Sequence, residues 1–276
     1  MEKLDIRSDI DSGSVETIVM TQGLTKRKFV LLALGFLVFN SSTTFANDDD
    51  LEALNQRIFR LFKQGKYQEA IPLAEKAVEI TRRLRGPEDT KTATSLNSLA
   101  LLYWKMGEYA KAEPLYQEAL RIYQKVLGPE HPFTATSFNN LAALFMEMGE
   151  YAKAEPLYQE ALRINQKVLG PEHPNTATSL NNLAMLYDEM GEYAKAGPFL
   201  QEALRIRQKV LGTEHPSTAT SLNNLAMLYD HMAEYAKAEP LYLEALRINQ
   251  KVLGPEHPDT AASLDNLAGL YDHMGE

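Results

Sequence analysis

The segment LNNLAMLYDEMGEYAKA, residues 180–196, decides the fold because close copies of it recur along the chain. Each copy is followed by LGPEHP or, once, by LGTEHP. The glycines that mark the same place in successive copies are 42 residues apart: Gly86, Gly128, Gly170, Gly212 and Gly254. A fixed period of this length predicts a chain built from stacked repeats, each burying its apolar face against its neighbours.

Each repeat contains two predicted helices. In the quoted copy, the first helix carries Leu180, Leu183 and Leu186 on one side and ends at Gly191, a residue that commonly closes a helix in a left-handed conformation. The following first helix opens with His-Pro, and we expect the histidine to cap it, because the first copy has Asp89 there. The predicted helix pairs cover about residues 51–85, 93–127, 135–169, 177–211 and 219–253, and a half repeat covers 261–276.

The segments LNNLAMLYDEMGEYAKA and EPLYQEALRINQKVLGPEHP resemble the tetratricopeptide repeat, in the 42-residue form typical of kinesin light chains. The resemblance covers Leu51 to Glu276. It implies an all-α fold, a right-handed superhelical solenoid of stacked antiparallel helix pairs whose first helices line an inner groove. It also implies a non-enzymatic scaffold that binds a peptide or protein partner in that groove.

Three first helices carry a pair of asparagines on the side opposite the leucines, where helical spacing predicts an exposed strip, and the flanking copies carry one asparagine beside Ser98 or Asp265. An amide both donates and accepts hydrogen bonds, so the strip could pair with the backbone of an extended peptide. The resemblance implies the same use, because related repeats hold peptides through an asparagine near this place. The predicted groove residues are Asn97, Trp104, Lys105, Asn139, Asn140, Asn181, Asn182, Asp188, Asn223, Asn224, Asp230 and Asn266.

Near the ends of the first helices, the groove residues change along the chain. The first two repeats offer Phe59, Phe62, Lys63, Leu101, Trp104 and Lys105. The later repeats offer Met146, Glu147, Asp188, Glu189, Asp230, His231, Asp272 and His273. We therefore expect a groove that is aromatic and basic at its N-terminal end and acidic towards its C-terminal end. The alternative is a solvated helix face, with Phe59 and Phe62 closing the array.

The composition argues against several other classes of protein. A net charge of −9 does not suit nonspecific nucleic-acid binding, which needs clustered Lys and Arg. The absence of cysteine excludes thiolate metal sites and cysteine nucleophiles. The sequence has no GxSxG, phosphate-loop or HExxH motif, so we expect neither catalysis nor a cofactor. The repeated histidines stand one repeat apart, which favours helix capping over metal binding.

The N-terminal segment has the layout of an export signal. A basic cluster, Lys26 to Lys28, precedes an apolar run from Phe29 to Phe39 that is too short to span a bilayer. Small residues then lead to Ala46, after which we expect cleavage. The predicted signal is residues 1–46, with Met20 as a candidate start, and the array is residues 47–276. An uncleaved signal that anchors the chain to a membrane is the alternative.

The repeat pattern reaches residue 276 directly after a first helix, whereas repeat arrays usually end in a helix with a polar outer face. Leu264, Leu267 and Leu270 keep the pattern of an internal repeat. Two expectations stay open: the last helix is an imperfect cap, or the chain is the N-terminal recognition arm of a longer bacterial effector, for example one with a CHAT-type protease domain. The sequence predicts neither the partner nor the oligomeric state.

Overall fold

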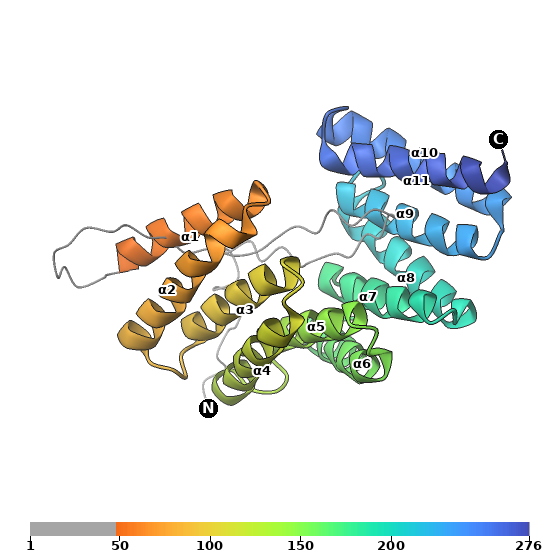
Figure 1. Cartoon of the computed structure of the whole chain (residues 1–276). Helices are drawn as coiled ribbons and strands as arrows, with labels where there is room; N and C mark the ends of the chain where they lie inside the picture. Colours follow the sequence, from red (N-terminus) through yellow and green to blue (C-terminus); the bar gives the residue numbers. More distant parts are fainter. Residues whose placement is uncertain (1–47, 276) are drawn as a thin grey trace.

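The computed structural model describes residues 48–275, which form eleven α-helices arranged in one curved stack (Figure 1). The predicted signal, residues 1–46, lies outside the described residues. The first helices of successive repeats are α1 (Asp48–Lys63), α3 (Thr90–Lys105), α5 (Pro132–Glu147), α7 (Pro174–Glu189), α9 (Pro216–His231) and α11 (Pro258–Met274). The second helices are α2 (Tyr67–Arg85), α4 (Tyr109–Val126), α6 (Tyr151–Val168), α8 (Tyr193–Leu211) and α10 (Tyr235–Leu253). The predicted all-α solenoid of helix pairs is confirmed.

The first helices start where the sequence predicts, at a capped turn. In α7, the ring nitrogen Nδ1 of His173 accepts a hydrogen bond from the backbone N–H of Asn175, and Pro174 takes the first helical position. The histidines before α5, α9 and α11 do the same, and Asp89 caps α3 through its carboxylate. A threonine one turn later donates its hydroxyl to the carbonyl of the preceding loop glycine, as Thr176 does to Gly170 at 2.8 Å. The capping role predicted for the histidines is confirmed.

The turn between the two helices of a repeat requires a left-handed residue. Gly191 has φ of +71°, and its N–H bonds to the carbonyl of Asp188, which closes α7. Ala233 holds the same place after α9 with φ of +56° and is the non-glycine residue with positive φ in the described chain. A Cβ in this conformation is strained, so alanine costs stability at this turn relative to glycine.

Each second helix packs against its own first helix and against the first helix of the next repeat. The first helices α5, α7, α9 and α11 also touch one another in sequence. Contact between neighbouring first helices places them on the inner side of the curve. Figure 1 accordingly shows α4 and α6 on the outer side, below α3, α5 and α7. None of the helices in residues 48–275 is long and apolar enough to span a bilayer.

Replacing Ala233 by glycine should stabilise the chain, because glycine adopts positive φ without a steric penalty. We expect a gain of up to ~1 kcal/mol in the free energy of unfolding, measured by urea denaturation. The matched control is Gly191→Ala, which should lose a similar amount, since nothing lies within 4 Å of the added Cβ and only the backbone conformation is at stake. Equal stability of both variants and the parent would contradict the left-handed assignment.

Candidate functional site

The predicted asparagine strip is buried over the middle of the array, so the prediction that it is exposed is wrong there. The exposed fractions of Asn181 and Asn182 are 0% and 3%. Three more asparagines of the strip are also buried: Asn139, Asn223 and Asn224. The members that keep partial exposure are Asn97, Asn140 and Asn266.

The cause is the contact between neighbouring first helices. Helical spacing identifies the side of α7 that faces away from α8, but α5 and α9 cover much of that side. The amide Nδ2 of Asn224 donates to Oδ1 of Asn181 at 2.8 Å, across the contact between α9 and α7. Asn223 similarly donates to Oγ of Ser263 on α11 at 3.1 Å. We call this contact the seam, formed by Asn139, Asn181, Asn182, Asn223 and Asn224.

The seam does not satisfy all of its amides. Several buried side-chain atoms there have no hydrogen-bond partner among the described residues: Oδ1 of Asn139, Asn182 and Asn223, and Nδ2 of Asn181. A buried polar atom without a partner costs about 1–3 kcal/mol. The seam is therefore a polar layer inside the stack, and direct contact of these amides with a ligand stays a prediction.

One residue per repeat does reach the surface at the last turn of each first helix. We call these residues the terminal row: Lys63, Lys105, Glu147, Glu189, His231 and His273. Lys105 is half-buried, and the others are exposed. The row changes from basic through acidic to histidine along the chain, and the predicted graded groove stays a prediction.

At the basic end, most of the predicted apolar residues lie beneath the surface. Trp104 is only 4% exposed, and Phe62 and Leu101 are also buried, so the prediction that these three residues are open to a ligand is wrong, whereas Phe59 is partly exposed. They belong to the apolar core between the helices. The ammonium of Lys105 lies 4.8 Å from the centre of the Trp104 ring, within the range of a cation–π contact.

The charges of the terminal row influence one another. Burial lowers the pKa of Lys105 to about 8, and the Glu147 carboxylate partly opposes this. Burial raises the pKa of Glu147, and the neighbouring Glu189 carboxylate adds to the rise, while Lys105 opposes it. Lys105, Glu147 and Glu189 come from α3, α5 and α7, so the charge of the terminal row changes sign between the second and third repeats.

At the C-terminal end, each histidine of the terminal row pairs with an aspartate of the preceding repeat. Nδ1 of His231 lies 3.0 Å from each carboxylate oxygen of Asp188, and Nδ1 of His273 lies 2.9 Å from Oδ1 of Asp230. Asp188 is buried beneath its histidine, so the prediction that it lines the groove directly is wrong. Asp230 is partly exposed. Residues 48–275 contain no group of three or more side chains suited to hold a metal ion.

The hydrogen bond to Asp188 raises the pKa of His231, although burial opposes the rise. Asp230 and Glu189 also face this imidazole, and the ring of Tyr193 lies 6.3 Å from it.

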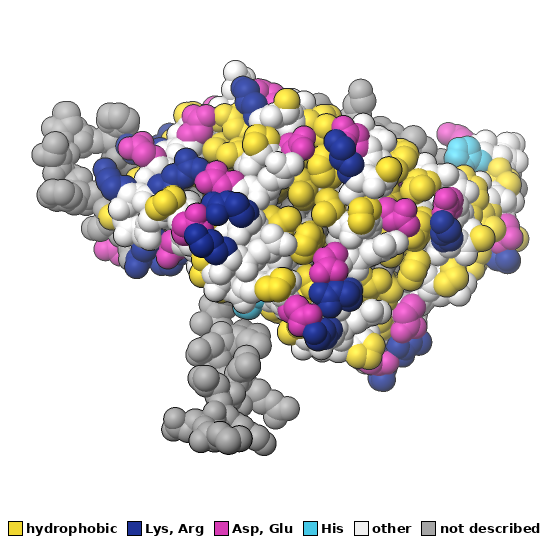
Figure 2. Space-filling view, turned by 90° about the horizontal axis from the view of Figure 1, so that it is seen from below, with side chains coloured by type: hydrophobic (Ala, Val, Ile, Leu, Met, Phe, Trp, Pro, Cys, Tyr) yellow, Lys and Arg dark blue, Asp and Glu magenta, His cyan; other side chains and the backbone are white. Residues whose placement is uncertain are grey.

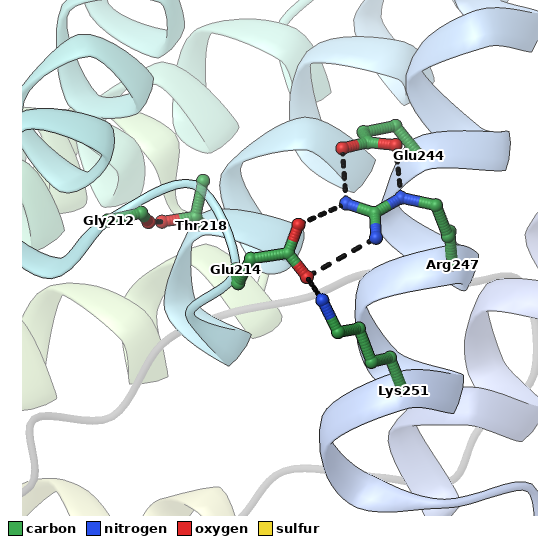
Figure 3. Close-up of polar contacts among 6 residues, drawn as sticks. All are labelled: Gly212, Glu214, Thr218, Glu244, Arg247 and Lys251. Carbon is green, nitrogen blue, oxygen red and sulfur yellow. Dashed lines mark hydrogen bonds and ion pairs between the residues drawn. The ribbon is translucent and has the colours of Figure 1, made fainter.

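The sequence reasoning missed an ion cluster on the loops before α3, α5, α7 and α9. Glu214 binds Arg247 at 2.6 Å and Lys251 at 2.8 Å, and Arg247 also binds Glu244 (Figure 3). Seen from the side of α4 and α6, basic and acidic side chains lie in mixed clusters with hydrophobic side chains between them (Figure 2). The sequence pattern could have predicted these clusters, because the Glu of LGPEHP and the Arg and Lys of ALRINQK recur at fixed spacing.

Arg207 is a second residue that the sequence reasoning missed. It is 1% exposed and donates to the Ser217 carbonyl, to Oγ of Ser221 and to Oγ1 of Thr178. None of these partners is a carboxylate, and burial lowers its pKa to about 10. The corresponding residues Asn165 and Asn249 make the equivalent serine contacts without a charge. The sequence alone could have pointed to Arg207, because the same position holds Asn in the repeat before it and in the repeat after it.

The Asp188–His231 pair gives a pH-dependent contribution to stability. Because the folded pKa of His231 is raised above its usual 6.5, this contribution is fully present below pH 6.5 and is lost as pH rises through the folded pKa. We expect the imidazole Cε1–H signal, followed by NMR, to titrate with a midpoint above 6.5. Asp188→Asn should move the midpoint down. A midpoint of 6.5 or lower in the parent chain would contradict the pair.

A family model described as the tetratricopeptide repeat matches residues 49–125, 96–164, 133–209, 189–251 and 231–276. The structure of BtubC (BKLC) from P. vanneervenii is similar with a TM-score of 0.65 and 30% sequence identity, over 76% of this chain and 84% of that one. A Podosopora anserina kinesin-light-chain-like protein with nearly identical TPR-like repeats has a TM-score of 0.61 and 29% identity, over 72% of this chain and 93% of that one. No curated protein matches the chain.

A more distant similarity shows the fold alone. The Rap protein complexed with competence and sporulation factor has a TM-score of 0.60 at 17% identity, over 79% of this chain and 64% of that one.

Proposed function

Because the chain belongs to the tetratricopeptide repeat family, in its kinesin-light-chain-like form, we propose that it is a non-enzymatic scaffold that holds a peptide or protein on its inner face. Scaffolding of protein partners fits the repeat fold. The finer part of the proposal concerns the place of binding, which is the terminal row. The observation that carries it is the contrast between a seam that repeats the same amides and a terminal row that changes charge along the array.

A constant seam and a varying row have different physical roles. Amides that recur at the seam link one first helix to the next, as Asn224 and Asn181 do. Exposed side chains that differ between repeats contribute little to stacking, so they are free to discriminate between ligands. The row therefore favours a ligand with an acidic group near Lys63 and Lys105 and a basic group near Glu147 and Glu189.

The spacing of the repeats fixes the spacing of those groups in the ligand. Packed helices lie about 10 Å apart, so Lys105 and Glu189, two repeats apart, are separated by about 20 Å. An extended chain advances about 3.3 Å per residue, so the acidic and basic groups of the ligand should stand about six residues apart. This geometry defines a ligand class without defining a particular partner.

The test uses the full chain and an array of extended peptides. One set carries an acidic and a basic residue six positions apart, and a matched set carries two charges of one sign. We expect binding to the mixed set, with an affinity that falls as salt rises, because the groups are exposed.

Two variants then assign the site. Glu189→Lys reverses a charge of the terminal row and should lower the affinity for the selected peptide by about 5–20-fold. Glu79→Lys makes the same change on the second helix α2 and should leave affinity unchanged. Equal affinity of Glu189→Lys and the parent chain would rule out the terminal row as the binding site. Seam variants such as Asn182→Ala are unsuitable, since their burial couples them to stability.

We also propose that the chain is exported, on the strength of the basic cluster, the apolar run and the small residues that precede Asn47. N-terminal sequencing of the protein from its native cells should find Asn47 as the first residue. An intact segment 1–46 in the membrane fraction would instead identify it as an uncleaved anchor.

A further inference from the structure

Several first helices carry a tyrosine whose hydroxyl donates a hydrogen bond to a glutamate of the preceding second helix. Tyr187 of α7 donates to Oε1 of Glu155 on α6 at 2.7 Å. The equivalent tyrosines pair in the same way, Tyr103 with Glu75 at 2.6 Å and Tyr271 with Glu239 at 3.0 Å. Helix α5 has Phe145 at this position and therefore has no hydroxyl to pair. A carboxylate is thus the regular partner of this tyrosine.

Tyr229 of α9 holds the same position without a carboxylate partner. Gly197 of α8 stands where α6, 42 residues earlier, has Glu155. Nε2 of Gln201 donates to the Tyr229 hydroxyl oxygen at 3.4 Å, and no oxygen of residues 48–275 accepts the hydroxyl hydrogen. The missing side chain also leaves the ring less covered, because Tyr229 is partly exposed whereas Tyr187 is only 5% exposed.

A lysine of the next second helix lies over each of these rings. Nζ of Lys195 is 5.0 Å from the centre of the Tyr187 ring, and Nζ of Lys237 is 5.2 Å from that of Tyr229. Each lysine also pairs with the glutamate three residues before it. The hydrogen bond to that glutamate raises the pKa of Lys195, and the charge of Glu155 adds to the rise. Lys237 lacks this second carboxylate, because α8 has a glycine there.

Neither packing nor backbone conformation requires a glycine at position 197. A Cβ on Gly197 would meet only Cδ2 of Leu228, at 3.6 Å, which is an ordinary van der Waals contact. The residue lies within α8 and does not have a positive φ. Glycine inside a helix lowers stability relative to alanine, so the local structure gains nothing from it. Its one effect on the surroundings is to leave the place of the carboxylate open.

The place left open is bounded by three helices, and we call it the open site: Gly197 and Gln201 of α8, Tyr229 of α9 and Lys237 of α10. A carboxylate there would accept a hydrogen bond from the tyrosine hydroxyl and face the lysine ammonium, both of which strengthen binding of an anion. We infer that the open site binds the side-chain carboxylate of a glutamate from a partner protein, which completes in trans the contact that other repeats make within the chain.

The open site is distinct from the terminal row. Tyr229 and His231 are two residues apart on α9, and two residues turn a helix by about 200°, so their side chains leave α9 on opposite sides. Gly197 and Lys237 place the open site between the second helices α8 and α10, whereas the terminal row belongs to the first helices. Either proposal can therefore be correct without the other.

The test uses the full chain with ¹³C-labelled tyrosine rings, followed by NMR. The probe is N-acetylglutamate N′-methylamide, a glutamate side chain with neutral ends, at constant ionic strength. We expect the ring signal that Tyr229→Phe removes to shift saturably with a Kd on the order of 10 mM, since one carboxylate gains only a few hydrogen bonds. The matched control probe is the glutamine analogue, which should shift nothing. The signal of Tyr187 should also stay unchanged, because Glu155 already occupies its site.

Substitutions at Gly197 separate binding from stability. Gly197→Glu supplies the carboxylate within the chain and should weaken the probe at least about 10-fold. Gly197→Ala removes the same helix penalty without adding a carboxylate, so it should keep the affinity within about 2-fold. Glu155→Gly opens the equivalent site in the earlier repeat and should make the Tyr187 signal respond to the probe. Circular dichroism shows whether each variant keeps its helix content.

Three outcomes would overturn the proposal. The first is the absence of a saturable shift of Tyr229 in the folded parent chain. The second is an equal shift with the glutamine analogue, because the site would then not select a carboxylate. The third is equal affinity of Gly197→Glu and the parent chain, which would place the probe elsewhere. None of these outcomes bears on peptide binding at the terminal row, which is measured with other ligands and other variants.

Discussion

No helix pair of this chain can bury its apolar face alone, and that constraint governs the rest of the structure. The core runs continuously from α1 into α9, because each second helix packs both on its own first helix and on the next one. Stability in such a stack is approximately the sum of what each repeat contributes and what each contact between neighbours contributes. The loop carboxylates and the seam add polar contacts where neighbouring repeats meet. Each junction between repeats is therefore held both by apolar packing and by an ion pair or an amide hydrogen bond.

Burying the polar groups at these junctions costs free energy, but their contacts fix the register between repeats. The buried guanidinium of Arg207 has no carboxylate among its partners, and several seam amides keep an atom without a partner. Such groups contribute less stability than apolar residues of similar size would. Their value lies in register, since an amide or guanidinium that must meet a particular serine tolerates little sliding of one repeat along the next. In the terminal row, the two histidines also join neighbouring repeats through Asp188 and Asp230, whereas the exposed Lys63 and Glu189 vary between repeats.

Much of the fold could be predicted from the sequence. The period, the histidine caps, the glycine turns and the left-handed Ala233 all follow from local rules that act over a few residues. The exposure of the asparagines could not be predicted in the same way. A helical wheel shows which side of α7 faces away from α8, but the curvature of the whole stack decides whether α9 covers that side. Trp104 and Asp188 were misplaced for the same reason, whereas Lys105 and Glu189, one residue further along each helix, do reach the surface.

The side-chain contacts between repeats have a limited reach along the chain. The seam bond from Asn224 to Asn181 and the pair between His231 and Asp188 both join residues 43 positions apart, and the loop carboxylates reach residues 33 and 37 positions away. Among residues 48–275, these contacts join neighbouring repeats. Removing or adding a whole 42-residue unit would therefore leave every type of contact with a partner of the same kind. The length of the array can therefore change in steps of one repeat while the architecture is preserved.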